Sequence, residues 1–245
     1  MRTLTVLGTC GAWPEAGRSA SGFLLEYDGF RVVLDLGYAT VPRLLEHRPG
    51  GDVDAVVVTH EHPDHCADLS ALTRARYFAD VRGPRIPLYC TPGVFSRVQA
   101  MEPTEDLNEV FDVHELPASY EVGPFRLDSA LLPHYVPHAG VRLSAPGLTV
   151  MYSADAGPAP ELAELAAGAD LFIAGVTLQG TVEEHDEPYL LTTVDAGQWA
   201  TRAGAKRLML THFWPGSDRK RWADDARTGF DGEVVIAEEG MVLTL

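Results

Sequence analysis

One ten-residue stretch, from Val56 to His65, constrains this chain more than any other part of the sequence. It opens with three consecutive valines and a threonine, and such a run of β-branched residues predicts a buried strand. The next six residues contain three imidazoles and two carboxylates. Imidazole nitrogen and carboxylate oxygen are ligands of borderline divalent metals such as zinc. The stretch therefore predicts a metal-binding loop at the end of a strand.

The order of residues within this loop predicts two adjacent metal sites. Alternate residues of a strand point the same way, so His60 and His62 are expected to face one ion. Pro63 breaks the strand, and Asp64 is expected to cap a helix that starts at His65 and runs to residue 77. Asp64 and His65 then point in another direction. A chance histidine-rich turn is the alternative, but this spacing directly behind an apolar strand favours metal binding.

The motif His60-X-His62-X-Asp64-His65 resembles the signature of the metallo-β-lactamase superfamily, whose members are mostly metal-dependent hydrolases. The resemblance implies an α/β fold of the α+β kind, an αβ/βα sandwich of two mixed β-sheets flanked by helices. Strand and helix patterns alternate in both halves of the chain, which agrees with layered sheets and helices. No linker, repeat or low-complexity segment interrupts them, so we expect one hydrolase domain over residues 1–245.

Three later positions, each at the end of an expected strand, offer the further ligands that two metal sites need: His134, Asp155 and His212. Any one of them alone would more often be an ordinary turn residue. Together they match the order of histidine, bridging aspartate and last histidine in the family. The resemblance sharpens to the RNase Z-like branch, and within it to actinobacterial cyclic nucleotide phosphodiesterases, through His134 to Gly140, Tyr152 to Asp155 and Leu210 to His212.

The resemblance implies two divalent metal ions as cofactors, zinc in the first place and manganese as the alternative. His138 is the rival of His134 as a ligand, and the spacing to Gly140 favours His134. The implied assignment gives one ion to His60, His62 and His134, the other to Asp64, His65 and His212, and both to Asp155 as the bridge.

Such a metal pair lowers the pKa of a bridging water and produces a hydroxide nucleophile. The same cations offset the charge that develops in the transition state. In the superfamily the residue at the place of Asp64 often also guides the proton of the water, so Asp64 is a candidate catalytic residue. The expected substrate is a small phosphodiester, with a cyclic nucleotide as the first choice.

The chain departs from the RNase Z-like pattern at two positions. Members of that branch usually carry a glutamate and a histidine that act on the leaving group, and the matching residues here are Gly175 and Leu190. Loss of a general acid typically slows reactions with poor leaving groups by roughly 10²–10⁴-fold. His185 is a candidate replacement acid, and a solvated acidic loop is the alternative interpretation of its surroundings.

The missing acid keeps other functions open. An ester, lactone or thioester has a better leaving group, so a hydrolase of small metabolites, for instance in secondary metabolism, is the second hypothesis. A protein that uses its metal site only for binding or structure is the third.

Charge and composition limit the partners. The formal net charge is −16 and the 19 lysines and arginines are scattered, whereas a nucleic-acid polymer needs a basic face. This argues against tRNA 3′-end processing and leaves a small-molecule substrate, which can be anionic because two divalent ions form a positive focus. The sequence contains no run of about eighteen apolar residues, so no membrane span is expected. Relatives of this type are often homodimers, so a homodimer is the expected assembly.

The cysteines, Cys10, Cys66 and Cys90, are odd in number and lack a ligand spacing, which predicts small core residues in a reducing cytoplasm. Asp35 is either a turn residue or, as the family implies, a carboxylate that orients the metal site. The aromatic residues around Trp13 and Trp214 follow strand ends of the site, and they either line a substrate pocket or serve ordinary packing.

Overall fold

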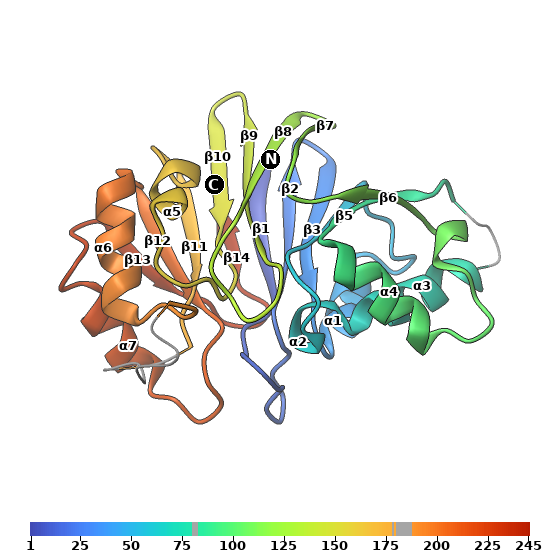
Figure 1. Cartoon of the computed structure of the whole chain (residues 1–245), viewed down its shortest axis with the longest axis horizontal. Coiled ribbons are helices and arrows are strands. Elements are labelled where there is room, and N and C mark those ends of the chain that lie inside the picture. Colours follow the sequence, from blue (N-terminus) through green and yellow to red (C-terminus); the bar gives the residue numbers. More distant parts are fainter. Residues whose placement is uncertain (80–82, 178, 180–187) are drawn as a thin grey trace. The chain divides into compact units, whose positions relative to one another are not determined.

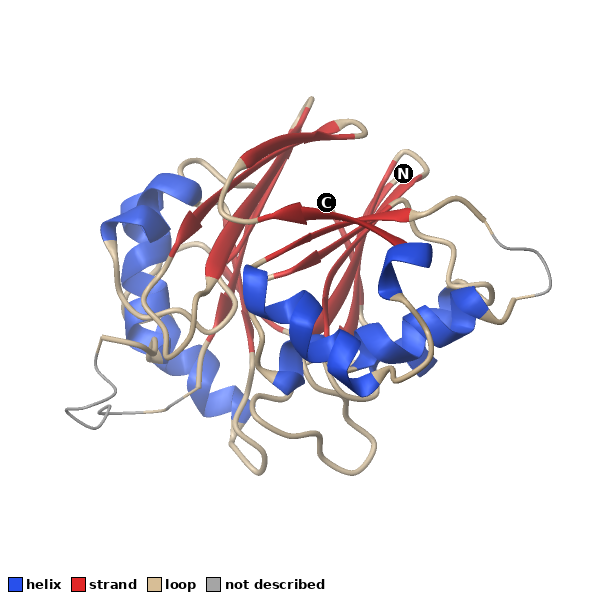
Figure 2. Cartoon of the chain, turned by 45° about the vertical axis from the view of Figure 1, so that its right-hand side comes forward, coloured by secondary structure: helices blue, strands red, loops and turns tan. Residues whose placement is uncertain are grey.

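The structure, a computed structural model, describes residues 1–79, 83–177, 179 and 188–245. These residues form two compact units, an N-terminal unit (1–116 and 238–244) and a C-terminal unit (117–237 and 245). Each unit contains one seven-stranded mixed sheet flanked by helices, as the expected fold class requires (Figures 1 and 2). The single hydrolase domain over residues 1–245 stays a prediction.

The sheet of the N-terminal unit changes from antiparallel to parallel pairing along its width. Its first three neighbour pairs are antiparallel and its last three are parallel. A two-residue hairpin joins β2 and β3 at Asp28 and Gly29, and both residues have the positive φ of a type I′ turn. In spatial order the strands are β14 (Val242–Thr244), β1 (Arg2–Gly8), β2 (Gly22–Tyr27), β3 (Phe30–Leu36), β4 (Ala55–Val58), β5 (Ile86–Cys90) and β6 (Phe111–Glu115).

The four α-helices of this unit share one hydrophobic core with the strands, to which they contribute residues such as Leu44, Leu72 and Val98. Figure 1 shows them beside the strands β1 to β5. The strand residues of this core include Val33 and Val56, both fully buried. The helices of the unit are α1 (Thr40–His47), α2 (Pro63–Cys66), α3 (Asp68–Tyr77) and α4 (Pro92–Met101), with a 3-10 helix at Leu107–Glu109.

The prediction of one helix from His65 to Tyr77, capped by Asp64, is wrong in two respects. The structure interrupts it at Ala67, which separates α2 from α3. The N-cap position of α2 belongs to His62, with Pro63 as the first helical residue, so Asp64 lies inside the first turn. Its carboxylate accepts a hydrogen bond from the backbone N–H of Ala12 at 2.7 Å instead of capping the helix.

The sheet of the C-terminal unit has the same two kinds of pairing. Its strands pair antiparallel from β7 to β10 and parallel from β10 to β13. Strand β7 is not evident from the sequence pattern, because it is only four residues long and mostly exposed. The strands are β7 (Ser119–Val122), β8 (Phe125–Leu131), β9 (Ala139–Ala145), β10 (Leu148–Tyr152), β11 (Leu171–Gly175), β12 (Arg207–Thr211) and β13 (Glu233–Ile236).

The helices of the C-terminal unit, α5 (Pro160–Leu165), α6 (Thr193–Ala203) and α7 (Arg219–Ala226), pack into a second hydrophobic core. Helix α6 begins with a capping box between Thr192 and Asp195 and ends at Gly204, whose φ of 63° terminates the helix. A Cβ added at Gly197 would lie 2.3 Å from the carbonyl oxygen of Ala226, so only glycine permits this close approach of α6 to α7.

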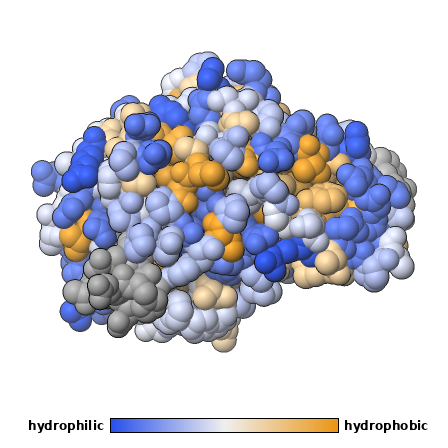
Figure 3. All heavy atoms as spheres, in the orientation of Figure 1, coloured by the Kyte–Doolittle hydropathy of each residue, from blue (hydrophilic) through white to orange (hydrophobic). Residues whose placement is uncertain are grey.

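The surface and the cysteines agree with the composition. Hydrophilic residues dominate the face drawn in Figure 3, where apolar residues form separate patches. All three cysteines are buried thiols, as predicted for small core residues. Among the described residues, no helix combines the length and apolar character needed to cross a bilayer. The cytoplasmic location stays a prediction.

Candidate metal-binding clusters

The first cluster lies where two parallel strands of the N-terminal unit end. Strands β3 and β4 pair in parallel, with Leu34 opposite Val57, so their carboxyl ends lie at one edge of the sheet. Asp35 comes from the end of β3, and Thr59 follows β4. The carboxylate of Asp35 accepts hydrogen bonds from the backbone N–H of Thr59 at 2.8 Å and from its hydroxyl at 3.0 Å. The edge of the sheet thereby fixes the residue that precedes His60.

This contact orients two of the histidines. Asp35 Oδ2 also lies 2.7 Å from His65 Nδ1, and because a carboxylate accepts, that nitrogen carries the proton. The hydroxyl of Thr59 donates to Asp35, so its oxygen accepts from His60 Nδ1, which lies 3.1 Å away. In both histidines Nε2 is then left with the lone pair that a metal ion requires. Asp35 is therefore more than a turn residue: it orients the cluster.

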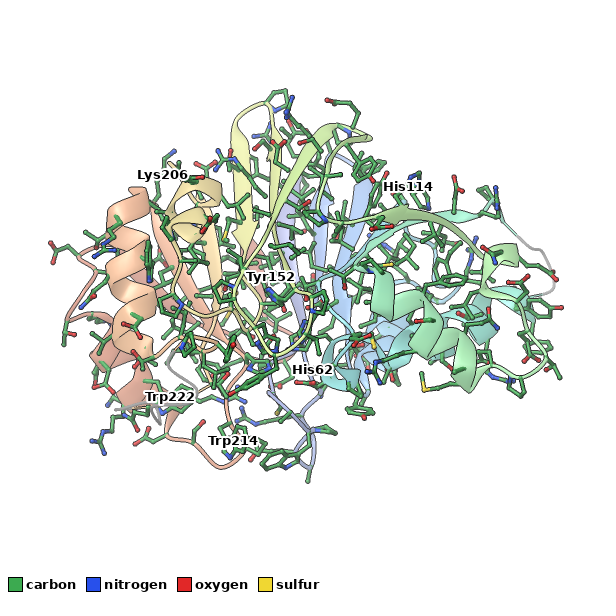
Figure 4. All side chains as sticks on the ribbon, viewed as in Figure 1. His62, His114, Tyr152, Lys206, Trp214 and Trp222 are labelled. Carbon is green, nitrogen blue, oxygen red and sulfur yellow. The ribbon has the colours of Figure 1, made fainter. Side chains whose placement is uncertain are left out.

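His62 and Asp64 complete the cluster of the N-terminal unit. His62 Nδ1 lies 3.0 Å from His60 Nε2, so the two imidazoles bring their nitrogens to one point (Figure 4 labels His62). Asp64 Oδ2 lies 3.5 Å from His65 Nε2. A Cβ added at Gly37 would lie only 1.8 Å from the carbonyl oxygen of Asp64, so a glycine is required behind this loop.

The second cluster lies at the strand ends of the C-terminal unit. His134 is in the loop between β8 and β9, Asp155 follows β10, and His212 directly follows β12. Neighbouring strands in this sheet bring these ends together, as the pairs Leu131 with Ala139 and Tyr152 with Val141 show. Three candidate ligands that are far apart in the sequence thus belong to one edge.

Asp155 is the centre of this cluster. Its Oδ2 lies 3.2 Å from His134 Nε2 and 3.7 Å from His212 Nε2. His134 Nδ1 lies 3.2 Å from the backbone carbonyl oxygen of Tyr189, and because a carbonyl only accepts, Nδ1 carries the proton. His212 Nδ1 lies 3.1 Å from the hydroxyl of Thr177. In this cluster too, each histidine is held through Nδ1 and presents Nε2.

The loops that carry these side chains are conformationally strained. Only six of the described residues other than glycine have a positive φ, and three of them belong to the clusters: Asp35 at 56°, Ala154 at 48° and His212 at 60°. Such conformations are unfavourable for residues with a Cβ and persist where surrounding contacts impose them. The strain is therefore located where the ligand side chains are aimed.

The remaining predicted site residues divide into those with a defined position and one without. His138 is 1% exposed, and its ring centroid lies 5.4 Å from that of His134. His185 lies outside the described residues, so its role as an acid stays a prediction. Thr59, Thr177 and Tyr189 are contacts that the sequence did not reveal. Thr59 could have been found from its position before His60, but Tyr189 acts through its backbone, which leaves no sequence signal.

The two departures from the RNase Z-like pattern have a structural basis. Gly175 ends β11, and a Cβ there would lie 2.1 Å from the carbonyl oxygen of Ala154 and 3.1 Å from the backbone nitrogen of Asp155. A glutamate at this position would displace the loop that carries Asp155. Leu190 is buried, with 8% of its side chain exposed. The described part of the site therefore has no room for the acid at Gly175.

Two groups beside the first cluster are accounted for by their own contacts. Burial raises the pKa of the Cys66 thiol to about 12, and its Sγ donates to the carbonyl oxygen of Glu61 at 3.6 Å. The hydrogen bond from Arg97 holds the pKa of the Glu61 carboxyl below its usual value, with the two charges 3.0 Å apart. Cys66 is a protonated core residue, and Glu61 is committed to an ion pair.

Comparison with known proteins assigns the chain to a family. The family described as "Beta-lactamase superfamily domain" matches residues 28–213, so the chain belongs to the β-lactamase superfamily. Together with the fold and the His/Asp clusters, this makes it a metal-dependent hydrolase with the metallo-β-lactamase fold.

Individual relatives agree with this assignment. An uncharacterized protein of Mycobacterium tuberculosis is 31% identical over 248 residues, which cover 96% of this chain and 90% of that protein. A ribonuclease Z of Kineococcus radiotolerans is 26% identical over 98% of this chain and 90% of its own length. The crystal structure of the metallo-β-lactamase fold protein YhfI from Bacillus subtilis matches with a TM-score of 0.88 and 27% identity, covering 99% of this chain and 98% of that one.

Proposed function

We propose that the two clusters together hold two divalent metal ions and that the protein is a dinuclear hydrolase of small phosphodiesters, such as a cyclic nucleotide. His134, and not its rival His138, is the ligand in this proposal, because its Nε2 lies 3.2 Å from Asp155. The proposed ligands are His60, His62 and His134 for one ion, Asp64, His65 and His212 for the other, and Asp155 for both.

A single observation carries the proposal: four histidines are held in the same way. In His60, His65, His134 and His212, Nδ1 contacts an oxygen of the protein at 2.7–3.2 Å. Metal-binding histidines are usually held in this manner, since the contact fixes ring orientation and tautomer and increases the basicity of the other nitrogen. Histidines that lie on a surface by chance are not expected to share this Nδ1 contact.

The donor set fits a zinc pair, with manganese as the alternative, because it combines imidazole nitrogens and carboxylates. When bound, such ions supply a hydroxide nucleophile near neutral pH and offset negative charge on the substrate. The residues of the chain do the rest. Asp155 would be a ligand of both ions, Asp35 would keep two histidines oriented, and Asp64 would be the carboxylate available to accept a proton.

Two facts support a small phosphodiester as the substrate. A relative over 98% of this chain is named ribonuclease Z, and the backbone of RNA is a phosphodiester. A chain with a formal charge of −16 is poorly suited to a polyanion, which depends on basic residues for most of its affinity. Phosphodiester chemistry on a small molecule reconciles both facts. The proposed partners are thus a small substrate and no nucleic-acid polymer; the homodimer stays a prediction.

The packing of Gly175 favours a second candidate function, the hydrolysis of an ester, lactone or thioester. A Cβ at that position would lie 2.1 Å from the carbonyl oxygen of Ala154, so the acid that the RNase Z-like branch carries there cannot be accommodated. Substrates with good leaving groups need no such acid. For a phosphodiester with a poor leaving group, another group such as His185 must protonate the leaving oxygen.

The decisive experiment joins metal analysis to a substrate panel. The purified protein is analysed for zinc and manganese, and its turnover of cyclic AMP, bis-p-nitrophenyl phosphate, a lactone and a thioester is then measured with each metal. We expect two metal ions per chain and turnover of both phosphodiesters. Turnover of the lactone or thioester alone would establish the second candidate instead.

Two further outcomes bear on the remaining hypotheses. Two bound metal ions without turnover of any substrate would leave a protein that uses its metals for binding or structure. A protein that never retains metal would refute the dinuclear site. For His185→Ala, a rate on cyclic AMP equal to that of the unmodified protein would exclude the replacement acid, whereas a loss of roughly 10²-fold or more would support it.

A further inference from the structure

A pocket of about 260 Å³ lies beside the second cluster and has no role in the chemistry described above. Its walls come from the segment after β11 and from the loop between β12 and α7. Figure 4 labels Trp214 and Trp222, which belong to that loop and to α7. The residues that matter for its chemistry are Thr177, Trp214, Pro215, Ser217, Asp218 and Trp222.

Local sequence fixes the shape of this loop. Phe213 is fully buried, contacts the ring of Trp222 at 5.5 Å and lies beneath the guanidinium of Arg219 at 4.5 Å. The next four residues form a turn in which the N–H of Ser217 donates to the carbonyl oxygen of Trp214 at 3.1 Å. Proline at the second position and Gly216 at the third, with a φ of 81°, are the residues of a type II turn.

This turn ends in a capped helix, so the pocket has a preformed wall. Asp218 accepts a hydrogen bond from the backbone N–H of Arg221 and caps α7. Phe213 anchors the loop from inside, whereas the indole of Trp214 is 41% exposed. A large apolar ring held outward on a rigid turn presents a flat binding surface at little conformational cost.

One hydrogen bond connects this pocket to the proposed metal site. Thr177 lines the pocket, and its hydroxyl lies 3.1 Å from Nδ1 of His212. A group bound in the pocket is therefore next to the residue that holds a proposed metal ligand. A substrate whose scissile bond is at the metal ions would place its adjacent group here.

We propose that this pocket binds the planar aromatic ring system of the substrate, a nucleobase in the case of a cyclic nucleotide, against the face of Trp214. The proposal rests on the proposed function and names the substrate class more closely. The volume of about 260 Å³ is below the roughly 300–1,000 Å³ of most ligand sites, so the pocket accepts one ring system and not a whole ligand.

The polar part of the pocket distinguishes a base from an aliphatic group. The Oγ of Ser217 is buried and has no hydrogen-bond partner within the part of the chain that the structure describes. A buried hydroxyl without a partner is unfavourable. Because Ser217 lines the pocket, rotation of its side chain would bring the hydroxyl to the edge of a bound heteroaromatic ring, whose nitrogen and amino groups supply a partner. Stacking on tryptophan together with an edge contact is typical of base recognition.

Calorimetric titration of the metal-loaded protein with adenosine tests this directly, because adenosine has the base but no scissile phosphodiester. We expect binding to the unmodified protein and a dissociation constant roughly 5- to 100-fold weaker for Trp214→Ala. Trp214→Phe keeps a flat ring and should restore most of the affinity. Trp199→Phe, on α6 and outside the pocket lining, is the matched control and should bind as the unmodified protein does.

The outcomes separate this proposal from the proposed function. No adenosine binding, or equal binding by Trp214→Ala and the unmodified protein, overturns the pocket whatever the substrate panel shows. Binding that depends on Trp214 in a protein without phosphodiesterase activity keeps the pocket and removes the proposed reaction. If cyclic AMP is a substrate, Trp214→Ala should raise KM by a similar factor and leave kcat nearly unchanged, since the base is not at the reacting bond.

Discussion

The two units of this protein are built on the same plan but supply their ligands differently. In each, a seven-stranded sheet passes from antiparallel to parallel pairing, and the polar cluster follows the ends of its strands. The N-terminal unit takes four proposed ligands from one run of six residues, His60 to His65. The C-terminal unit takes three from positions that span 79 residues, His134 to His212. A shared architecture therefore does not require a shared sequence pattern.

The support of the two clusters differs as well. In the N-terminal unit one buried carboxylate, Asp35, bonds to both the histidine loop and the preceding threonine. In the C-terminal unit the carboxylate Asp155 is itself the centre, and its histidines are held by a backbone carbonyl and by Thr177. We infer that the first cluster depends on one orienting residue, whereas the second depends on its bridging ligand.

The largest effect is expected at that bridging ligand. Asp155→Ala removes a ligand of both proposed ions, so metal content should fall and hydrolysis should be abolished. Asp128→Asn, which removes a carboxylate paired with Arg126 on β8, is the control in the same unit and should leave both unchanged. Metal analysis and turnover check the result, and two tightly held ions in the alanine variant would refute the bridge.

A smaller effect is expected at the orienting residues. Asp35→Asn should weaken metal affinity by roughly 10- to 100-fold, the usual range for groups that orient metal ligands. Asparagine is the appropriate substitution because it tolerates the φ of 56° at this position. Thr177→Val removes a single contact, to His212, and should weaken affinity less. Competition with a chromogenic chelator measures both, and an equal loss would contradict the difference between the clusters.

Each unit has a glycine packed against the backbone of a proposed carboxylate ligand, and stability tests whether the two are equivalent. Gly37→Ala and Gly175→Ala place a Cβ at 1.8 and 2.1 Å from a carbonyl oxygen, so each should lower the free energy of unfolding by about 1–3 kcal/mol. At Gly50 the nearest atoms belong to the exposed side chain of Asp52 and not to backbone, so Gly50→Ala is the control. Urea unfolding measures all three. If only one of the two substitutions lowered the free energy of unfolding, the two glycines would not support their clusters equally.

The smallest expected effect is a loss of stability at alkaline pH that is confined to the N-terminal unit. All three cysteines belong to the N-terminal unit, and burial raises the pKa of the Cys90 thiol to about 12. An unfolded thiol has a pKa of about 8.5, so the folded state loses stability as pH rises above that value, by about 1 kcal/mol near pH 9. Cys90→Ala should reduce this alkaline loss.

Hydrogen exchange at pH 7 and 9, followed by mass spectrometry of peptides from each unit, measures the effect. Protection factors, which correct for the faster intrinsic amide exchange at higher pH, are expected to fall at pH 9 in the peptides around β5 and not in those of the C-terminal unit. An identical profile in the variant and the unmodified protein would assign the alkaline loss to another group.

The sequence alone determined the motif His60 to His65, the family and most strands and helices, because these depend on residues that are close together along the chain. Strand β7 gives no clear signal in the sequence, since its alternation is weak and its side chains are largely exposed. The helix after Pro63 was placed as one piece because local pattern does not show the interruption at Ala67.

The tertiary structure decided what the pattern left open. Asp35 became an orienting carboxylate only when the parallel pairing of β3 and β4 brought it to Thr59 and His65. The contact of Tyr189 with His134 uses a backbone carbonyl. Every residue has such a group, so the type of residue at position 189 does not predict the contact. Strand ends meet at the edge of a sheet through pairing between distant segments, and side-chain chemistry alone does not specify that pairing.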